Sequence, residues 1–246
     1  MLSQTEQSVK KCYQKHSLPR LEKPRFVRLK FSKVGKLQFI SHLDLHRTFN
    51  RAIIRAGIPA WYTQGFNPHT KLVFATPLSI GAQSTCEYLD VRVDREMSPE
   101  EIMNRLNAEL PGEMQITDAF FPSTPFSDIV WSEYTLTVHA LDELSNVVTS
   151  LTDLFGQDSI VLPKKTKSGE KDINIQPMIK ALSVTVEDDN LIINTVLSAN
   201  SREYLNPEML IKAILKYLPD VFGDKSPLYN IVRNKVLLAD GVTEFR

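Results

Sequence analysis

Cysteine is scarce in this sequence, since Cys12 and Cys86 are the only two in 246 residues and 74 positions separate them. Neither belongs to a CxxC pair, so no disulfide framework is expected, and isolated thiols of this kind are typical of a reducing compartment. Iron–sulfur clusters are bound by several thiolates that the fold brings together. Two distant cysteines cannot supply that ligand set, so this chain cannot bind such a cluster by itself.

Long apolar runs and several glycine-containing catalytic motifs are also absent. No segment approaches the roughly 18 consecutive apolar residues of a membrane helix, and the first residues contain no apolar secretory segment. We therefore expect a cytoplasmic protein that has no membrane contact. The sequence has no GxxxxGK(S/T), GxGxxG or GxSxG pattern, which leaves nucleotide hydrolysis, dinucleotide redox chemistry and α/β-hydrolase chemistry without support. No cofactor is expected.

Charge is sorted along the chain, although Lys and Arg balance Asp and Glu at 29 each. Residues 1–76 contain fourteen basic and three acidic side chains, a net charge of +11, which leaves residues 77–246 with −11. An asymmetry of this size indicates a polyanion or an acidic protein as the partner of the basic part. The alternative, that the two parts neutralise each other within one molecule, is equally open.

The pattern of apolar residues predicts an α+β protein. A length of 246 residues has room for one large domain or two ordinary ones, and an apolar content of 42% is ample for a core. In the first part, alternation, caps and turn residues predict the order β-α-β-β-α-β with one additional short strand. The expected strands are 25–32, 58–62, 71–75, 85–93 and 114–121, and the expected helices are 42–56 and 99–110.

The second part repeats this arrangement after a Pro- and Ser-rich boundary at 122–125. We expect strands at 133–140, 159–162, 179–187, 190–198 and 229–238, helices at 141–155 and 207–217, and a basic loop or hairpin at 164–171. The fold class is therefore α+β, with two tandem ferredoxin-like units that have antiparallel sheets. The expected organisation is a basic arm at 1–24, a first domain at 25–124 and a second domain at 125–246.

The first expected helix has clear signals at both ends. Ser41 is a candidate N-cap with Asp44 at the third helical position, and Gly57 is a candidate C′ residue. The apolar face consists of Leu45, Phe49, Ala52, Ile53 and Ala56. The opposite side presents arginines at positions 47, 51 and 55, and neighbouring like charges destabilise an isolated helix slightly. This row is either a solvated surface or a ridge that binds anions.

A dense set of motifs fills residues 31–91. It includes FSKVGKLQFISHLDL at 31–45, QGFNPH at 64–69 and EYLD at 87–90, and two later segments, KKTKSG at 164–169 and DINIQP at 172–177, extend it. This pattern resembles the radical-SAM-linked protein family, and the resemblance extends over about residues 25–240. Members of that family occur as a C-terminal part of a radical-SAM protein or are encoded beside one, and their own activity is uncharacterised.

The resemblance implies that the partner of this chain is a radical-SAM protein. It does not indicate any reaction that this chain catalyses. A radical-SAM enzyme binds its cluster through three closely spaced cysteines, so this chain is not itself such an enzyme. Three features depart from the family pattern: Thr70 stands where a proline is usual, His46 stands where an apolar residue is usual, and residues 1–24 form an added arm. These departures affect the details of any shared site.

Charged and aromatic side chains of the same segment form a candidate binding site. Cations neutralise phosphates and flat side chains stack on bases, which is the combination that single-stranded RNA binding requires. Trp61 and Phe39 are instead expected in the core. The candidate binding residues are Lys33, Lys36, His42, Arg47, Arg51, Arg55, Tyr62, Gln64, Phe66, Asn67 and Lys71.

The histidines allow a second interpretation, which is metal binding. His42 and His46 are four residues apart on a helix and, with His69 or Cys86, have zinc-ligand chemistry. His42 falls in the first helical turn, where a neutral imidazole can help bind an anion or cap the helix, and a structural or capping use is favoured over metal binding. Cys86 is expected to be a buried strand residue. We therefore expect no metal site.

Three functions remain open. The first is an accessory protein of a radical-SAM enzyme that binds RNA or an anionic substrate through its basic face. The second is a metal-independent endoribonuclease in which His42 and Tyr62 serve as acid and base, an idea that rests on fold analogy alone. The third is a pure protein-docking module for the radical-SAM partner.

Overall fold

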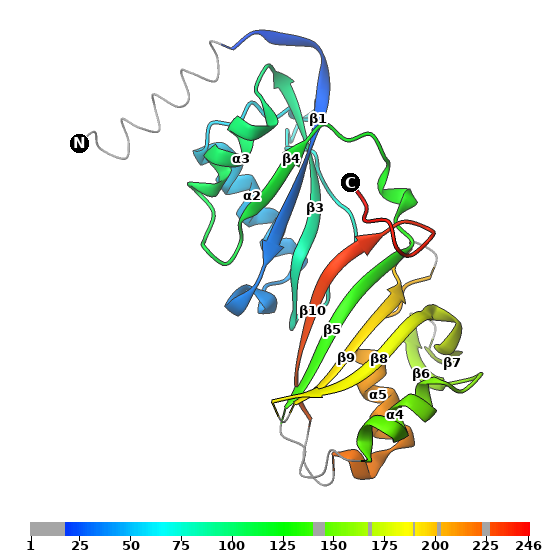
Figure 1. Cartoon of the computed structure of the whole chain (residues 1–246). Coiled ribbons are helices and arrows are strands. Elements are labelled where there is room, and N and C mark those ends of the chain that lie inside the picture. Colours follow the sequence, from blue (N-terminus) through cyan, green and yellow to red (C-terminus); the bar gives the residue numbers. More distant parts are fainter. Residues whose placement is uncertain (1–17, 140–145, 167–168, 189, 201–202, 223–226) are drawn as a thin grey trace. The chain divides into compact units, whose positions relative to one another are not determined.

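Two units of antiparallel sheet and helix make up the chain in a computed structural model (Figure 1). The model describes residues 18–139, 146–166, 169–188, 190–200, 203–222 and 227–246. Unit 1 is Met1–Pro125 together with Arg246, and unit 2 is Phe126–Phe245. Residues 1–17 of the expected basic arm, the end of the strand expected at 133–140 and the start of the helix expected at 141–155 lie outside the described residues.

Unit 1 contains a four-stranded sheet in which every neighbouring pair is antiparallel and the strand order is β4-β1-β3-β2. The first and last strands of the unit are therefore neighbours. Along the chain the elements are β1 (Arg20–Lys33), the 3-10 helix η1 (Gly35–Phe39), α2 (His42–Arg55), β2 (Leu72–Phe74), β3 (Ala82–Arg95), α3 (Pro99–Asn107) and β4 (Ile116–Phe120).

The core of unit 1 lies between this sheet and its two helices. Alternation along β1 turns Val27, Leu29 and Phe31 inward, and all three are fully buried. The ring of Phe31 meets that of Phe49 on α2 edge to face, with centroids 4.8 Å apart. Ile102 of α3 belongs to the same buried cluster, so both helices cover the same face of the sheet.

The expected boundaries of α2 are confirmed. The hydroxyl of Ser41 accepts a hydrogen bond from the backbone N–H of Asp44 at 3.2 Å, which satisfies one of the free donors of the first turn. Gly57 has φ of +65°, the left-handed conformation that ends a helix and that glycine adopts without steric cost. The expected apolar face is buried, including Leu45 and Phe49.

A buried ion pair links β1 to β3. Arg28 is 1% exposed, and its Nε and Nη2 donate to the two carboxylate oxygens of Asp90 at 2.8 and 2.9 Å. Its Nη1 also donates to the carbonyl of Thr124 at 2.8 Å. The guanidinium thus has an opposite charge and hydrogen-bond acceptors in an environment where an unpaired charge is very costly.

Unit 2 has the same order of strands, β10-β5-β9-β8, again with antiparallel neighbours. Strands β6 and β7 form a separate hairpin. Its elements are β5 (Trp131–His139), α4 (Val147–Phe155), β6 (Val161–Thr166), β7 (Gly169–Asn174), β8 (Ile179–Glu187), β9 (Asn190–Ser198), α5 (Glu208–Tyr217) and β10 (Leu228–Leu237), with short 3-10 turns at Phe126–Asp128, Gln176–Met178 and Pro219–Val221.

The prediction of an α+β protein with antiparallel sheets is confirmed at this level, and several details were wrong. β1 begins at Arg20, inside the expected arm. The partly buried side chains of Leu18 and Leu21, on either side of Arg20, pack on the core, and a register irregularity between Arg20 and Arg25 accommodates Pro24. The strand expected at 58–62 is reduced to single bridges at Ala60 and Tyr62. The strand expected at 159–162 joins the basic segment in the β6–β7 hairpin.

Phe39 was wrongly expected in the core. It ends η1 and is 65% exposed, because the chain turns away from the core there before α2 begins. Trp61 is half-buried and stacks under the guanidinium of Arg92. Within the described ranges, no helix has both the length and the apolar character needed to cross a membrane.

Candidate functional site

The segment between α2 and β2 forms a loop that is closed by hydrogen bonds between its two ends. The backbone N–H of Thr63 donates to the carbonyl of His69 at 2.9 Å, and the N–H of His69 donates to the Thr63 hydroxyl at 3.1 Å. The adjacent bridge between Tyr62 and Thr70 continues this pairing. The loop between these contacts therefore has fixed ends and a defined shape.

The tip of this loop presents an aromatic ring to solvent. Phe66 has a relative exposure of 111%, so its whole side chain is accessible. Gln64 and Asn67, which flank it, are also exposed and add amide donors and acceptors. A fully exposed phenylalanine on a closed loop gains nothing from burial in this chain, and both faces of its flat ring are accessible for stacking.

Helix α2 turns a row of polar side chains toward this loop. His42, His46 and Asn50 are four residues apart and share one side of the helix. The Asn50 Nδ2 and the His46 Nδ1 are 2.8 Å apart, and the Thr70 hydroxyl donates to the Asn50 Oδ1. Because Nδ2 of an asparagine can only donate, His46 Nδ1 accepts, and the proton of the neutral imidazole is on Nε2. We call these helix residues and residues 62–71 the α2–loop face.

The electrostatics of this face favour a neutral His46. Partial burial lowers the pKa of His46 below its ordinary value of 6.5, and the nearby imidazoles of His42 and His69 lower it further. A proton on Nδ1 would also place two donors face to face and break the bond to Asn50. The hydrogen-bond chain from His46 to Thr70 therefore belongs to the neutral state.

We expect the stability of unit 1 to fall as pH drops from 7.5 to 5.5. The unfolded chain takes up a proton on His46 near pH 6.5, whereas the folded state does so only at lower pH, so the loss begins as pH falls through 6.5. Thermal unfolding followed by circular dichroism should show a smaller pH dependence in His46→Leu than in wild type. Equal pH dependence in both proteins would contradict this assignment.

A small cavity lies at the start of α2. It is lined by Lys33, Ile40, Ser41, His42, Leu45, Phe74, Thr76, Leu78 and Glu87, and its volume of about 20 Å³ has room for about one water molecule. Lys33 and Glu87 are 3% and 6% exposed, and the Lys33 Nζ donates to the carbonyl of Gln38 at 3.4 Å. Of the candidate residues, the structure thus brings Lys33 and His42 together in a mostly enclosed site.

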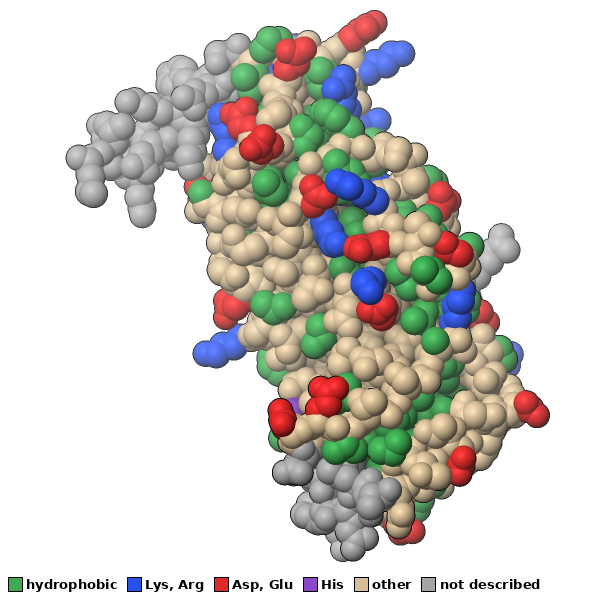
Figure 2. Space-filling model, in the orientation of Figure 1, with side chains coloured by type: hydrophobic (Ala, Val, Ile, Leu, Met, Phe, Trp, Pro, Cys, Tyr) green, Lys and Arg blue, Asp and Glu red, His purple; other side chains and the backbone are tan. Residues whose placement is uncertain are grey.

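The arginine row is exposed but largely neutralised. Arg47 pairs with Asp44 at 3.3 Å, and Arg55 pairs with Glu109 at 3.0 Å. Among the described residues, Arg51 has no ion-pair or hydrogen-bond partner, and the exposed Lys36 and Lys71 have none either. Figure 2 shows that Lys and Arg side chains on the face it presents lie among Asp and Glu side chains and form no continuous basic patch.

Neither alternative chemistry gains support from this geometry. Burial raises the pKa of Tyr62, which keeps its phenol protonated and makes it a poor base. Tyr62 does not line the cavity that contains His42. In the part of the chain that the structure describes, no group of three His, Cys, Asp or Glu side chains could hold a metal ion. Cys86 is buried in β3, as expected.

Sequence reasoning missed Asn50, Thr70 and Phe74 as members of the site. Phe74 contacts His42 edge to face with ring centroids 5.1 Å apart, and it also meets Phe49 in the core. Asn50 was recognisable, because it continues the four-residue spacing of His42 and His46. The bond of Thr70 to Asn50 depends on where the chain returns after the loop, which no local pattern in the sequence specifies.

The fold and the α2–loop face define an α+β protein with an exposed aromatic loop beside a histidine row. A family model described as an uncharacterized protein conserved in bacteria (DUF2344) matches residues 27–207, which is most of the chain, and the protein belongs to that family. No curated protein matches the chain.

Three solved structures show distant similarity to this chain. A structure of a Cbf5-Nop10-Gar1 complex aligns with TM-score 0.47 and 7% identity over 86% of this chain and 49% of that one, so this chain spans about half its length. An unknown protein from Galdieria sulphuraria aligns with TM-score 0.26, 14% identity and coverages of 86% and 99%. A putative glycine cleavage system transcriptional repressor aligns with TM-score 0.21, 12% identity and coverages of 86% and 99%.

Proposed function

We propose that this protein binds single-stranded RNA through the α2–loop face together with the exposed side chains of Lys36 and Arg51, and acts as an accessory protein of a radical-SAM enzyme. The observation that carries the RNA proposal is the fully exposed ring of Phe66 on a loop whose ends are fixed by Thr63 and His69. Aromatic rings in such positions stack on unpaired bases with little dependence on sequence. Gln64 and Asn67 beside the ring offer hydrogen bonds to base edges.

The closed loop supports this proposal because it reduces the entropy lost on binding. A flexible loop must be ordered when a ligand binds, and that ordering weakens affinity. Here the hydrogen bonds between Thr63 and His69 order the ends of the loop before any ligand arrives. The backbone that carries Phe66 is therefore restricted at both ends of the loop in the free protein.

The charged side chains divide into two groups with different expected contributions. Lys36, Arg51 and Lys71 are exposed and have no ion-pair partner among the described residues, so they are available to phosphates. Arg47 and Arg55 are held by Asp44 and Glu109. This division narrows the expected basic face from the six candidate Lys and Arg side chains to three.

We expect the logarithm of the RNA affinity to fall with the logarithm of salt concentration with a slope of about −2. Each phosphate contact of a single strand contributes roughly −0.7, and three cations are available. Fluorescence anisotropy with a labelled oligonucleotide should show that Arg51→Gln reduces the slope by about 0.7. Arg55→Gln, its matched control on the same helix, should change the slope less.

Absence of RNA binding at low salt would overturn the RNA proposal. In that case the protein-docking function would take its place, provided that the tagged protein retains a radical-SAM protein after nuclease treatment of the lysate. The accessory role is supported by the resemblance of residues 31–91 and by the two distant cysteines, which leave cluster chemistry to another chain.

We further propose that each unit is a ferredoxin-like domain. The support is that both have the order last, first, third and second strand, once the β6–β7 hairpin is set aside as an insertion in unit 2. Under this proposal the boundary lies between Pro125 and Phe126.

A further inference from the structure

The outer face of the unit 1 sheet, which is the side opposite α2 and α3 (Figure 1), carries a row of three side chains from neighbouring segments. In the register of β1 and β3, Phe26 lies directly opposite Arg92. Trp61 adjoins Arg92 on the other side, because its backbone N–H donates to the Arg92 carbonyl at 2.7 Å. The adjacent residues Val27 and Val91 are buried in the core, so alternation directs this row away from the helices.

Arg92 is held between the two aromatic rings of this row. Its guanidinium carbon lies 4.9 Å from the ring centroid of Phe26 and 4.9 Å from that of Trp61. Stacking on both sides fixes the plane of the guanidinium and leaves its N–H edge for hydrogen bonds. The orientation of this edge is therefore set before any ligand binds, which reduces the entropy that binding costs.

The hydrogen-bonding capacity of Arg92 is unused within the described ranges. Its Nε is buried without a hydrogen-bond partner, and neither Nη donates to a described residue. Asp94, two residues further along β3, forms no ion pair with it, so the guanidinium is not neutralised. The side chain of Arg92 is half-buried, so its Nη groups rather than the buried Nε are accessible. An accessible guanidinium without an acceptor is suited to bind an oxyanion.

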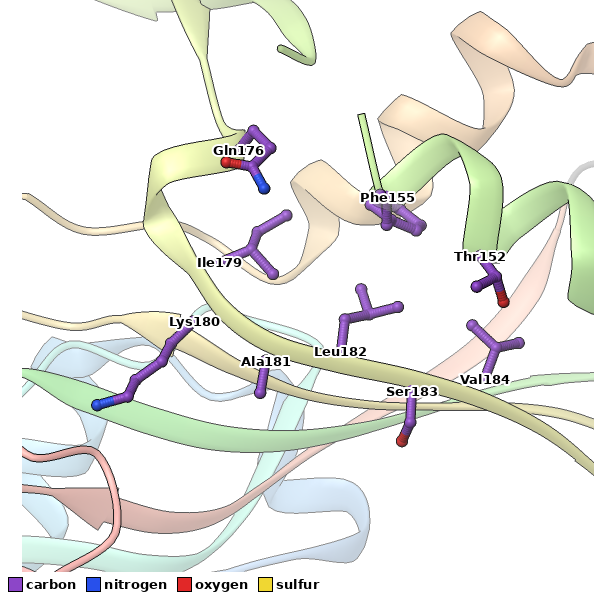
Figure 3. A pocket seen from close by; sticks show the side chains of 10 residues that line it. Thr152, Phe155, Gln176, Ile179, Lys180, Ala181, Leu182, Ser183 and Val184 are labelled. Atoms are coloured by element: carbon purple, nitrogen blue, oxygen red, sulfur yellow. The ribbon is translucent and has the colours of Figure 1, made fainter. Parts of the chain in front are cut away.

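Two other places lack this combination of an aromatic ring and an available cation. Arg28 lies on the same face, but it is 1% exposed and all its nitrogens already donate, so the accessible row ends before it. In unit 2, a groove of about 470 Å³ between β8 and α4 contains the ring of Phe155 (Figure 3). Among the described residues that line it, Lys180 is the one cation, and it points away from Phe155 toward the Asp240 carbonyl and the Trp131 ring.

We propose that Arg92 binds a phosphate of the same RNA strand that stacks on Phe66, an inference that rests on the proposed function. Trp61 directly precedes Tyr62, the first loop residue of the α2–loop face. Five residues separate Trp61 from Phe66, a backbone span of at most about 18 Å. One short oligonucleotide can therefore reach both places. The location suits this ligand, because RRM domains bind single-stranded RNA on the open face of a four-stranded sheet.

Fluorescence anisotropy with a labelled single-stranded oligonucleotide tests this inference on the full chain. With Arg92 as a fourth phosphate contact, the wild-type salt slope becomes about −2.8, whereas the three other cations alone give about −2. Arg92→Met keeps an apolar chain between the rings and should reduce the slope by about 0.7 and the affinity at low salt by about tenfold. Arg92→Lys keeps the charge and should retain the slope, with a smaller loss of affinity.

Two further variants separate a contact to RNA from a structural role of Arg92. Arg25→Met removes an arginine that also lies over a ring, that of Phe121 at 4.8 Å. Arg25 pairs with Val93, which faces the core, so it is not on the outer face, and the affinity and slope should stay the same. Asp94→Asn removes a negative charge beside the row and should raise the affinity at low salt by about twofold. A purely structural role would lower the melting temperature of Arg92→Met and leave RNA binding by Asp94→Asn unchanged.

The outcomes distinguish this inference from the proposed function. If Phe66→Ala weakens RNA binding while Arg92→Met behaves like Arg25→Met, the proposed function stands and the inference is overturned. A wild-type protein that binds no RNA at low salt overturns both. Unchanged RNA binding by Arg92→Met, together with loss of the radical-SAM protein retained from nuclease-treated lysate, would assign the row to a protein partner instead.

Circular dichroism spectra show whether each variant is folded. If Arg92→Met does not fold, the wild-type slope and the Asp94→Asn variant decide the same question. A slope near −2 together with an unchanged affinity in Asp94→Asn rejects a phosphate contact at Arg92.

Discussion

Replacing Asp90 with alanine is expected to lower the free energy of unfolding of unit 1 by about 3–5 kcal/mol. The guanidinium of Arg28 is 1% exposed and donates to both oxygens of this carboxylate, so the substitution removes its opposite charge while it stays buried. Removing both charges is less harmful, because no buried charge is left without its counterion. Arg28→Met combined with Asp90→Ala should therefore be more stable than Asp90→Ala alone.

The two tryptophans allow this measurement to be made on one unit. Trp61 lies in unit 1 and Trp131 in unit 2, and the chain has no others. In a Trp131→Phe background, urea unfolding followed by fluorescence reports on unit 1. Glu101→Ala removes the exposed ion pair of α3 and serves as the control, with an expected cost of about 0.5 kcal/mol or less. A similar cost for Asp90→Ala would contradict the assigned role of the buried pair.

Replacing Phe66 with alanine is expected to weaken binding of single-stranded RNA by about tenfold or more. Stacking of a base on an aromatic side chain contributes roughly 1–3 kcal/mol, and Phe66 is the most exposed of the large apolar side chains in the described residues. Because the ring contacts nothing that stabilises the fold, the melting temperature should stay the same. Fluorescence anisotropy with a labelled pyrimidine oligonucleotide measures the affinity.

Two controls separate stacking from a general loss of apolar surface. Phe66→Trp preserves a flat face and should bind RNA at least as tightly as wild type. Phe121→Ala removes another exposed aromatic side chain of unit 1, one that lies outside the α2–loop face, and should leave the affinity unchanged. An equal loss in Phe66→Ala and Phe121→Ala would reject the loop as the binding element.

Local signals in the sequence predicted much of the fold. The cap at Ser41, the glycine at 57 and the proline that opens α3 all act within one turn of a helix, so they can be read without knowing the tertiary structure. Strand limits were less accurate, because pairing partners set them. The start of β1 at Arg20 depends on pairing with Arg95, far along the chain.

The candidate site was predicted less completely, for the same reason. The sequence indicates which side chains share a face of α2, but the acid that pairs with Arg55 comes from residue 109, beyond α3. The structure links Thr70 and His46 through Asn50. The link between these two positions runs through a third residue, so neither position alone could reveal it.

The placement of the first strand beside the last in each unit sets an order of events during synthesis. β1 cannot complete its pairing until β4 has left the ribosome, and β5 must wait for β10. In each unit the first strand therefore gains its neighbouring last strand late, by contacts between distant residues, which makes this pairing slow. The four strands of unit 1 can nevertheless pair with one another while the ribosome is still adding unit 2.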